Sequence, residues 1–551
     1  MFDRAGEWPD RPMLRHWHDG AWHGTDWASF ARQAASVARR LRQAGVGVGD
    51  RVLIVAENRP EYPIAETALL SIRAVPVPTY TTNTMADHAH VLRDSGARVA
   101  IVSTAALAAR VAAAAAGSLD LMVTMEPFAH PGLMVVPWAA LADDERGYED
   151  MAAEAAIIPA TALACIIYTS GTGGLPKGVM LPHRAILANI EGARDLLRPL
   201  KLDREVYLSF LPLSHSFEHT AGQFFLLSVG TEIVYARGVE HLAADMLSVQ
   251  PSIMAMVPRI LEVIRARILA QVARAPAWRR ALFHHAVEIG RRRMEGERRG
   301  LVGALLDGPL ERMVRQKVRA RFGGRFRAAM SGGARLEPEV ARFFLGLGID
   351  MLQGYGQTEA GPVVSANAPG SMRVESVGRP LDGVAVRIAE DGEILLRGDL
   401  VMAGYWGQPA ATAAAIRDGW LHTGDVGVLD ADGFLHITDR KKDILVLSGG
   451  ENVSPARLEG LLTAEPAIAQ ALVAGEGQPG PCALLVAADG VDAAGVAAAV
   501  ARVNKGLSPT ERLRRHHLVP AFTQENGMLT PTQKLRRHVV LREHGALVRG
   551  S

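Results

Sequence analysis

Short apolar runs alternate with segments of helical periodicity over the first two thirds of the chain. The continuous runs at residues 51–56, 98–102, 162–169 and 252–257 predict buried strands. Residues 64–73 and 183–197 have the pattern of helices, and Pro199 ends the second because proline cannot continue the hydrogen-bond ladder. This alternation predicts layered α/β subdomains with largely parallel sheets.

The pattern changes near Val377 to short strands of alternating polarity. These strands are expected at residues 384–388, 393–397 and 426–429, and Asp430-Ala-Asp-Gly433 predicts a tight turn into another at 434–438. They indicate a small antiparallel barrel. A helix starting at Pro455 and later apolar runs predict a compact α+β unit. We therefore expect an α/β fold with a large N-terminal domain, 1–438, and a small C-terminal domain, 439–551.

Composition sets limits on the kind of protein. The 551 residues are enough for several compact units, and 48% hydrophobic with 21% charged residues is a globular balance. A net charge of +2 gives no reason to expect a nucleic-acid partner. No signal peptide or membrane-spanning helix is predicted. Cys165 and Cys482 are too few and too far apart for a disulfide scaffold, which favours a cytoplasmic location.

The strongest local signal for chemistry is a glycine-rich loop after the strand that ends at Thr169. Glycines let backbone N–H groups converge on phosphate oxygens, while hydroxyls and a lysine add donors and charge. The loop is not a Walker A motif, because Pro176 and Gly178 stand where that motif needs Gly and Ser or Thr. The candidate phosphate-binding residues are Thr169, Ser170, Gly171, Thr172, Gly173, Gly174 and Lys177. The chain has only seven lysines, and four lie in this loop or in the motifs below.

This loop resembles the phosphate loop of the adenylate-forming superfamily, which includes acyl-CoA synthetases, luciferases and peptide-synthetase adenylation domains. The family usually has Thr where this chain has Gly173, a departure that weakens the expected pyrophosphate contacts. Two further motifs, Met330-Ser-Gly-Gly-Ala334 and Gln353-Gly-Tyr-Gly-Gln-Thr-Glu359, extend the resemblance. It implies an adenine site that contains Gly332, Gly333, Ala334, Gly354, Tyr355 and Gly356.

The same resemblance assigns the catalytic and metal roles. Thr358 is expected at the α-phosphate, and Glu359 is expected to hold Mg²⁺, with Thr169 as a water-mediated second contact. Asp425, in Gly419-Trp-Leu-His-Thr-Gly-Asp425, corresponds to the residue that accepts the ribose hydroxyls. In the run 439–455, Arg440 corresponds to the ribose-contacting arginine and Lys442 to the hinge pivot, whereas Lys441 is expected to be an ordinary solvated residue. The resemblance thus implies that the C-terminal domain is mobile about a hinge near 440–442.

The motif at residues 526–537 resembles the C-terminal segment that carries the catalytic lysine, here Lys534. Residues 208–222, 448–455 and 529–532 are similar to the long-chain fatty acyl-CoA synthetase branch. His215 either lines the carboxylate end of the acyl pocket or caps a helix. The implied substrates are a fatty acid, ATP and CoA, with Mg²⁺ as cofactor. The implied reaction forms an acyl-adenylate and then an acyl-CoA.

Several alternatives stay open on the sequence. The acyl acceptor could be a carrier-protein thiol, or the acid could be an aryl or short-chain acid. Gly173 is the only support for an inactive nucleotide-binding homologue. The basic helical segment 259–301 is either a solvated helix pair or a contact with CoA phosphates or with the inner face of a membrane. Monomer and dimer are both compatible with the sequence.

Overall fold

The computed structural model describes residues 1–142, 146–169, 175–202, 204–295, 300–449, 451–530 and 533–549, without the side chains of 300–304 and 452. Its contacts divide the chain into two compact units. The first contains Met1–Gly171, Leu175–Ala385 and Leu396–Leu421. The second contains Val386–Leu395 and His422–Ser551. The domain boundary expected at 439 stays a prediction.

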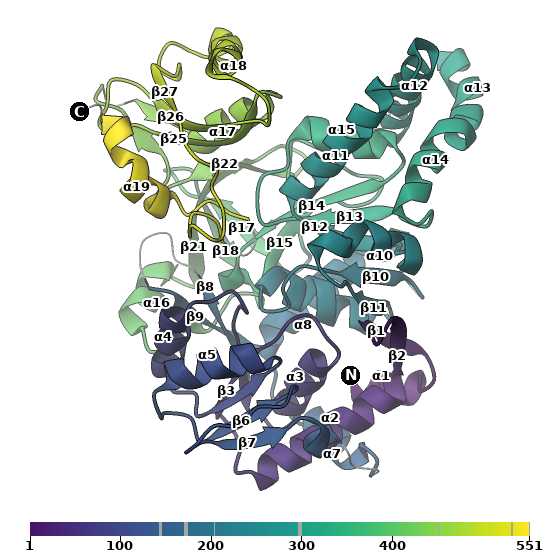
Figure 1. The fold of residues 1–551 in the computed structure, drawn as a ribbon, viewed down its shortest axis with the longest axis vertical. Helices are drawn as coiled ribbons and strands as arrows, with labels where there is room; N and C mark the ends of the chain where they lie inside the picture. The colour runs from purple at the N-terminus through teal and green to yellow at the C-terminus, as the bar shows by residue number, and fades with distance from the viewer. Residues whose placement is uncertain are drawn as a thin grey trace. The chain divides into compact units, whose positions relative to one another are not determined.

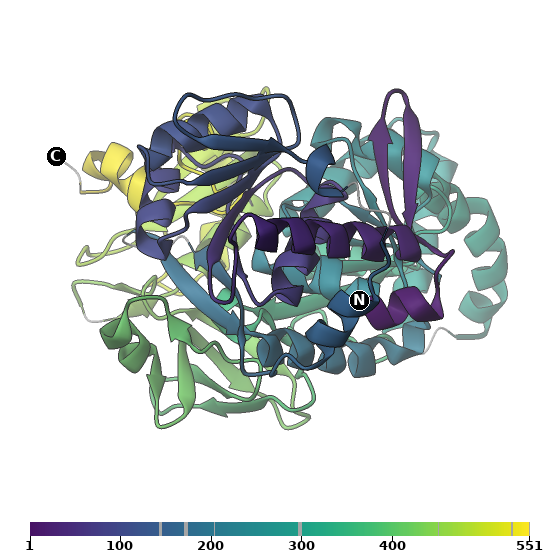
Figure 2. The same ribbon diagram turned by 90° about the horizontal axis from the view of Figure 1, so that it is seen from below.

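A nine-stranded sheet organises the first unit (Figure 1). Strands β10 to β14 pair in parallel in the order β11-β10-β12-β13-β14, so their carboxyl ends share one edge. Figure 2 shows the hairpin of β1 (Pro12–His18) and β2 (Ala21–Asp26) and, beside it, the long helix α2 (Trp27–Gln43). The strands, in spatial order, are β16 (Arg379–Pro380), β15 (Val363–Ala366), β14 (Asp350–Gly356), β13 (Ala328–Ser331), β12 (Ile253–Met256), β10 (Val206–Ser209), β11 (Glu232–Tyr235), β1 (Pro12–His18) and β2 (Ala21–Asp26).

A second sheet of five parallel strands lies nearer the N-terminus of the chain. Its central strands are buried along their length, which is why they read as unbroken apolar runs rather than as alternating ones. In spatial order they are β4 (Val75–Pro78), β3 (Arg51–Val55), β5 (Val99–Val102), β6 (Leu121–Thr124) and β7 (Met134–Pro137).

The helices of the first unit follow the apolar periodicity. Helix α8 begins and ends as the sequence predicts, and α3 is shifted by two to three residues. These helices are α1 (Phe2–Glu7), α2 (Trp27–Gln43), α3 (Glu61–Ser71), α4 (Met85–Ser95), α5 (Ala105–Ala115), α6 (Ala139–Ala142), α7 (Glu149–Ala156), α8 (His183–Leu197), α9 (Leu226–Ser228), α10 (Leu242–Val249), α11 (Pro258–Ala273), α12 (Ala277–Met294), α13 (Gly300–Leu310), α14 (Gln316–Arg319), α15 (Pro338–Gly346) and α16 (Pro409–Ala415).

One predicted strand has an unexpected partner. The run ending at Thr169 forms β8 (Leu163–Thr169), which pairs antiparallel with β9 (Lys177–Pro182) in a three-stranded sheet completed by β19 (Gly404–Tyr405). The register places Thr169 opposite Lys177. The two ends of the glycine-rich loop are therefore held side by side, although the loop residues Ser170, Gly171, Thr172, Gly173 and Gly174 lie outside the described residues.

The short strands after Val377 form one small sheet of β17 (Ala385–Ile388), β18 (Glu393–Arg397), β20 (Ile416–Arg417), β21 (Trp420–Leu429) and β22 (Leu435–Arg440). The turn at 430–433 joins β21 to β22, as predicted, and Asp430 caps it by accepting from the backbone N–H groups of Asp432 and Phe434, both at 2.9 Å.

The second unit ends in a compact α+β arrangement. Strand β26 pairs antiparallel with β25 and parallel with β27, and the short pair β23 (Leu445–Val446) and β24 (Asn452–Val453) precedes them. Alternate side chains of β25 and β26 enter two different apolar clusters, so helices can cover both faces of the sheet. These elements are α17 (Pro455–Thr463), β25 (Ile468–Ala474), β26 (Cys482–Ala487), α18 (Ala493–Lys505), β27 (Arg515–Leu518) and α19 (Arg537–Arg549).

No helix in the described part of the chain is long and apolar enough to cross a membrane.

Candidate active site

Three of the predicted motifs follow parallel strands of the nine-stranded sheet, β10, β13 and β14. The loop after β10 carries His215, the turn after β13 carries Gly332 to Ala334, and β14 runs into Thr358 and Glu359. Because the carboxyl ends of parallel strands meet at one edge, these motifs converge there. Two contacts show it directly. The Ser216 hydroxyl lies 2.9 Å from that of Thr358, and a Cβ built on Gly332 would lie 3.5 Å from the Phe217 ring.

Glycines let the backbone pass closely at this edge. Gly333 has a φ of +81°, which a side chain would strain, and both Gly333 and Ala334 are exposed. A Cβ on Gly356 would come within 1.8 Å of the Pro362 carbonyl oxygen, and one on Gly354 within 3.0 Å of the Ser365 oxygen. Tyr355 lies between these two glycines and is only partly buried, so its ring has a partly open surface.

Glu359 is held in place by a residue that the sequence reasoning did not find. The Tyr405 hydroxyl donates to Glu359 Oε1 at 2.9 Å, and the Met402 N–H donates to the Glu359 carbonyl at 2.9 Å. Burial, together with the Glu359 carboxylate, raises the pKa of Tyr405, so this hydroxyl keeps its proton as a donor. The Lys177 ammonium lies 4.8 Å from the centre of the Tyr405 ring. Tyr405 thus links the end of the phosphate loop to the expected metal ligand.

The arrangement around Glu359 fits a magnesium ion that is bound mainly by phosphate. Mg²⁺ usually takes one or two protein carboxylates and completes its shell with phosphate oxygens and water. Glu359 is a single, oriented, partly exposed carboxylate, and Thr169 lies opposite Lys177 at the start of the glycine-rich loop. No cluster of three metal-binding side chains occurs among the residues that the structure describes.

The loop that carries Ser216 is anchored by a buried polar cluster. It continues into a π-helix, η2 (Glu218–Phe225), whose His219 Nε2 lies 2.5 Å from Glu66 Oε1. Gln223 donates to the other oxygen of Glu66 at 2.7 Å. Burial also raises the pKa of Glu218 to about 7, while the hydroxyls of Tyr207 and Ser209 donate to its carboxyl group.

His215 has a structural contact of the kind expected for a helix cap. Its Nδ1 accepts from the Phe217 N–H at 3.2 Å, and its backbone carbonyl accepts from the His219 N–H at 2.9 Å. These bonds favour the capping interpretation over a direct role at the acyl carboxylate.

The second unit brings together the other predicted residues. Asp425 on β21 lies opposite Arg440 on β22, and Arg440 Nε is 3.0 Å from Asp425 Oδ1. The Asp425 side chain is buried and that of Arg440 is half exposed. Burial, together with the charge of Arg440, lowers the pKa of the Lys534 ammonium to about 8, and the Asp425 carboxylate opposes both effects. Lys534 is therefore close enough to the Asp425–Arg440 pair to interact with it electrostatically.

Hydrogen bonds within the segment 523–535 hold the backbone on both sides of Lys534. Leu529 and Leu535 form an isolated antiparallel bridge, and the Thr530 hydroxyl accepts from the Lys534 N–H at 3.0 Å. Asn526 secures the start of the loop, because its side-chain oxygen accepts from the N–H groups of Thr523 and Met528. A lysine near the end of a chain would ordinarily be a mobile surface residue, whereas the backbone N–H and carbonyl of Lys534 both hydrogen-bond to Thr530.

The two lysines after β22 differ. Lys442 is exposed in the turn where the N–H groups of Asp443 and Ile444 both donate to the Arg440 carbonyl. Lys441, expected to be a plain solvated residue, pairs with Asp391 Oδ2 at 2.5 Å and with Glu393 Oε2 at 3.0 Å. Those bonds raise the pKa of Lys441. The ion pairs of Lys441 therefore stabilise the end of the strand that carries Arg440. Lys442 has no ion pair among the described residues.

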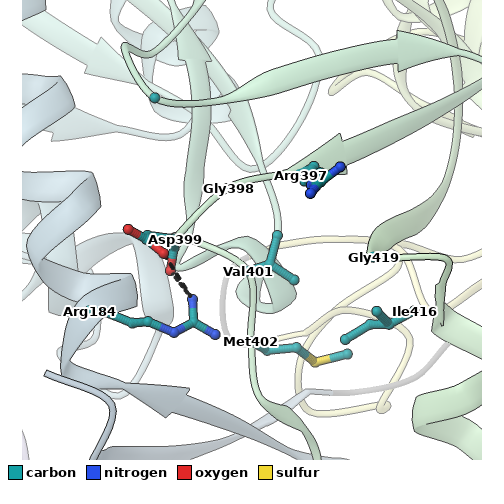
Figure 3. Close-up of a pocket in the computed structure, with 9 residues that line it drawn as sticks. Arg184, Arg397, Gly398, Asp399, Val401, Met402, Ile416 and Gly419 are labelled. Carbon is teal, nitrogen blue, oxygen red and sulfur yellow. Dashed lines mark hydrogen bonds and ion pairs between the residues drawn. The ribbon is translucent and has the colours of Figure 1, made fainter.

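A separate surface pocket of about 480 Å³ occurs in the first unit. Figure 3 shows Arg184 pointing toward Asp399, whose backbone carbonyl it binds, with Arg397 farther along the rim. None of the residues predicted for the active site lines this pocket. Its residues are Arg184, Gly383, Arg397, Gly398, Asp399, Val401, Met402, Ile416 and Gly419.

The chain belongs to the family of AMP-binding enzymes, whose model matches residues 1–406, and the model of the AMP-binding enzyme C-terminal domain matches residues 442–549. Within that family, the chain is 34% identical to the long-chain-fatty-acid–CoA ligase FadD15 of Mycobacterium tuberculosis, over 96% of this chain and 92% of the relative. It is 29% identical to the human long-chain-fatty-acid–CoA ligase 1, over 82% of this chain and 68% of the relative. The resemblance to the long-chain branch is thereby confirmed.

Solved structures confirm the predicted fold class. A benzoate CoA ligase from Burkholderia xenovorans superimposes with a TM-score of 0.75 at 20% identity, and the match covers 98% of each chain. The o-succinylbenzoate CoA synthetase MenE from Bacillus subtilis, in complex with its acyl-adenylate intermediate, gives a TM-score of 0.72 at 21% identity over 98% of this chain and 96% of that one.

Proposed function

We propose that the chain is an AMP-forming ligase that joins a long-chain fatty acid to CoA. The observation that carries the proposal is the grouping of Lys534 with Asp425 and Arg440, in a chain that matches long-chain-fatty-acid–CoA ligases over nearly its whole length. The substrates are a fatty acid, ATP and CoA, and Mg²⁺ is the cofactor. Mg²⁺ supplies charge neutralisation at the phosphates, where Glu359 would hold it.

In the first half-reaction, a carboxylate oxygen of the fatty acid attacks the α-phosphorus of ATP. The bond from that phosphorus to the bridging oxygen breaks, and pyrophosphate leaves with the electron pair. The protein has little covalent chemistry to perform, so its task is to hold two anions together and to neutralise the charge that develops. Lys534 would bridge the carboxylate and the α-phosphate, and Thr358, held by Ser216, would donate to the same phosphate.

In the second half-reaction, the CoA thiol loses its proton and its sulfur attacks the acyl carbon. The bond to the phosphate oxygen breaks, and AMP leaves. We propose that the C-terminal domain turns about Lys442 between the two steps, which withdraws Lys534. The exposed turn that contains Lys442 supports this role, because a hinge needs only a few residues that can absorb a change in backbone dihedrals.

The decisive experiment is a pyrophosphate-release assay with purified protein over acids from acetate to oleate, with and without CoA. The proposal expects release that depends on long-chain acids and acyl-CoA formation only when CoA is present. Preference for an aryl or short-chain acid, or transfer to a carrier-protein thiol but not to CoA, would contradict the long-chain CoA assignment. Binding of ATP without pyrophosphate release would indicate an inactive homologue.

We propose a cytoplasmic location, supported by two buried free thiols, Cys165 and Cys482, in a chain where neither has a disulfide partner.

A further inference from the structure

Helix α12 has two ends of very different electrostatic character. At its C-terminal end, Arg291 and Arg292 pair with Glu288, and Arg293 pairs with Asp307. Around its N-terminal end, the sequence from residue 263 to residue 287 contains no Asp or Glu. The positive charge is therefore balanced at one end of the helix and unbalanced at the other.

The unbalanced charge belongs to arginines on both sides of the turn at 274–276, which joins α11 to α12; Figure 1 labels the two helices. Arg267 on α11 and Arg274, which caps the C-terminal end of that helix, are both exposed, as are Arg279 and Arg280 in the first turn of α12. None of these four arginines has an ion pair among the described residues. We call this surface the arginine tip and define it as Arg267, Arg274, Trp278, Arg279 and Arg280.

The arginine tip also exposes a tryptophan. Trp278 is 63% exposed, and every residue from 276 to 281 is exposed, so nothing in the described chain covers the start of α12. The Arg279 guanidinium lies 5.0 Å from the centre of the Trp278 ring. A large ring left in water is costly, and tryptophan is the residue that prefers the boundary between lipid and water.

We propose that the arginine tip binds the surface of an anionic lipid bilayer. Clustered arginines attract acidic headgroups, and each arginine near such a surface strengthens binding roughly fivefold. Trp278 would enter the interface while the arginines stay at headgroup level. A nucleic acid fits less well, because a duplex is bound by positive charge spread along a groove or stripe, and the chain as a whole carries a net charge of only +2. The proposal is independent of the ligase activity.

The test measures partition of the full chain onto vesicles, without ATP or CoA. One set of vesicles is phosphatidylcholine alone, and the other adds phosphatidylglycerol. Binding is expected only with phosphatidylglycerol and should weaken as salt is raised, since salt screens the attraction. The triple variant Arg274→Gln, Arg279→Gln, Arg280→Gln should bind about a hundredfold more weakly. Trp278→Ala should weaken binding at high salt as well, because its contribution is not ionic.

A matched control removes the same charge elsewhere in the first unit. Arg32→Gln, Arg40→Gln, Arg93→Gln replaces three other exposed arginines and should leave vesicle binding within about twofold, since charge far from the contact is screened. Equal loss in both triple variants, equal binding to the two kinds of vesicle, or no binding by the wild type would overturn the proposal. So would binding to duplex DNA, but not to vesicles, that is lost in the arginine-tip variant. Unchanged pyrophosphate release by the variants shows that they are folded.

Discussion

At the scale of single residues, the proposed role of Lys534 requires a positive charge, but its surroundings favour the neutral amine. The ammonium must be positive to bridge a carboxylate and a phosphate, yet burial and Arg440 lower its pKa to about 8. Because Lys534 loses its proton at a lower pH than an ordinary lysine, the activity of the free enzyme should be sensitive to alkaline pH. The bound anions should then raise the pKa again, because opposite charges favour the protonated form.

This predicts the pH dependence of the first half-reaction. Below pH 8 Lys534 keeps its proton, so kcat/KM for pyrophosphate release should be level there and fall about tenfold per pH unit above it. The fatty carboxylate and the triphosphate stay ionised throughout that range. Lys534→Arg keeps the charge at all these pH values, so its lower activity should show no break near pH 8. A break that persists in Lys534→Arg would have to arise from another group.

Tyr405 connects the expected metal ligand to the phosphate loop through one side chain. Tyr405→Phe removes the hydrogen bond to Glu359 and keeps the ring under Lys177, whereas Tyr405→Leu removes both. Loss of a hydrogen bond to a charged group costs about 1.5–3 kcal/mol. We therefore expect Tyr405→Phe to raise the Mg²⁺ concentration needed for half-maximal pyrophosphate release by about tenfold or more. Only Tyr405→Leu should also raise the KM for ATP.

The Mg²⁺ requirement reports on the hydrogen bond between Tyr405 and Glu359, and the KM for ATP reports on the contact between the Tyr405 ring and Lys177. If Tyr405→Phe leaves the Mg²⁺ requirement unchanged while its thermal unfolding is also unchanged, Glu359 does not depend on Tyr405 for its orientation.

The residues that sequence reasoning missed have a common physical reason. Ser216 meets Thr358 across 142 positions, and Tyr405 meets Glu359 across 46. Neither contact follows from local periodicity, because each joins segments that are far apart in the sequence. The Gly-Tyr-Trp-Gly segment at 404–407, an aromatic pair between glycines, was the only local signal for Tyr405.

At the scale of elements, buried strands were predictable and their partners were not. The run ending at Thr169 is unbroken and apolar because it is buried, but burial does not say which strand lies beside it. Its antiparallel return through Lys177 depends on the loop between them. The helix at 183–197 was predictable to the residue, since Pro182 precedes it and Pro199 follows closely.

Helices α12 and α15 pack through a pair of glycines. A Cβ on Gly290 would lie 2.1 Å from the Gly346 carbonyl oxygen, and one on Gly346 would lie 2.4 Å from the Val287 oxygen. Backbone atoms cannot give way as a flexible side chain does, so Gly290→Ala should push the helices apart and destabilise the first unit by about 1–3 kcal/mol. The measurement is the midpoint of urea unfolding.

Gly6→Ala is the control for this helix contact. Gly6 lies in α1 with nothing within 4 Å of an added Cβ, so alanine there should leave the free energy of unfolding unchanged or raise it by up to about 1 kcal/mol through helix propensity. If the two alanine variants shift the midpoint alike, the close approach of α12 and α15 is not what requires glycine at 290.

At the scale of the whole molecule, the proposed reaction needs one chain to perform two half-reactions with different demands. The fold class and the family followed from motifs that span almost the whole sequence. The turn of the C-terminal domain about Lys442 stays a prediction, since sequence motifs identify a hinge without fixing the positions it joins.

The division of labour between Lys534 and Lys442 can be tested by separating the two half-reactions. Lys534→Ala removes the charge needed for adenylation, so it should abolish acyl-adenylate formation but leave thioester formation from supplied acyl-adenylate largely intact. Lys442→Pro fixes φ at the exposed turn, where a hinge must change its dihedrals. It should preserve pyrophosphate release in a single turnover and slow thioester formation. Lys441→Ala is a useful comparison, because Lys441 is braced by Asp391 and Glu393 and is not the expected pivot. Equal loss of both half-reactions in Lys534→Ala and Lys442→Pro would mean that one conformation serves both steps, and the proposed domain turn would then have no role.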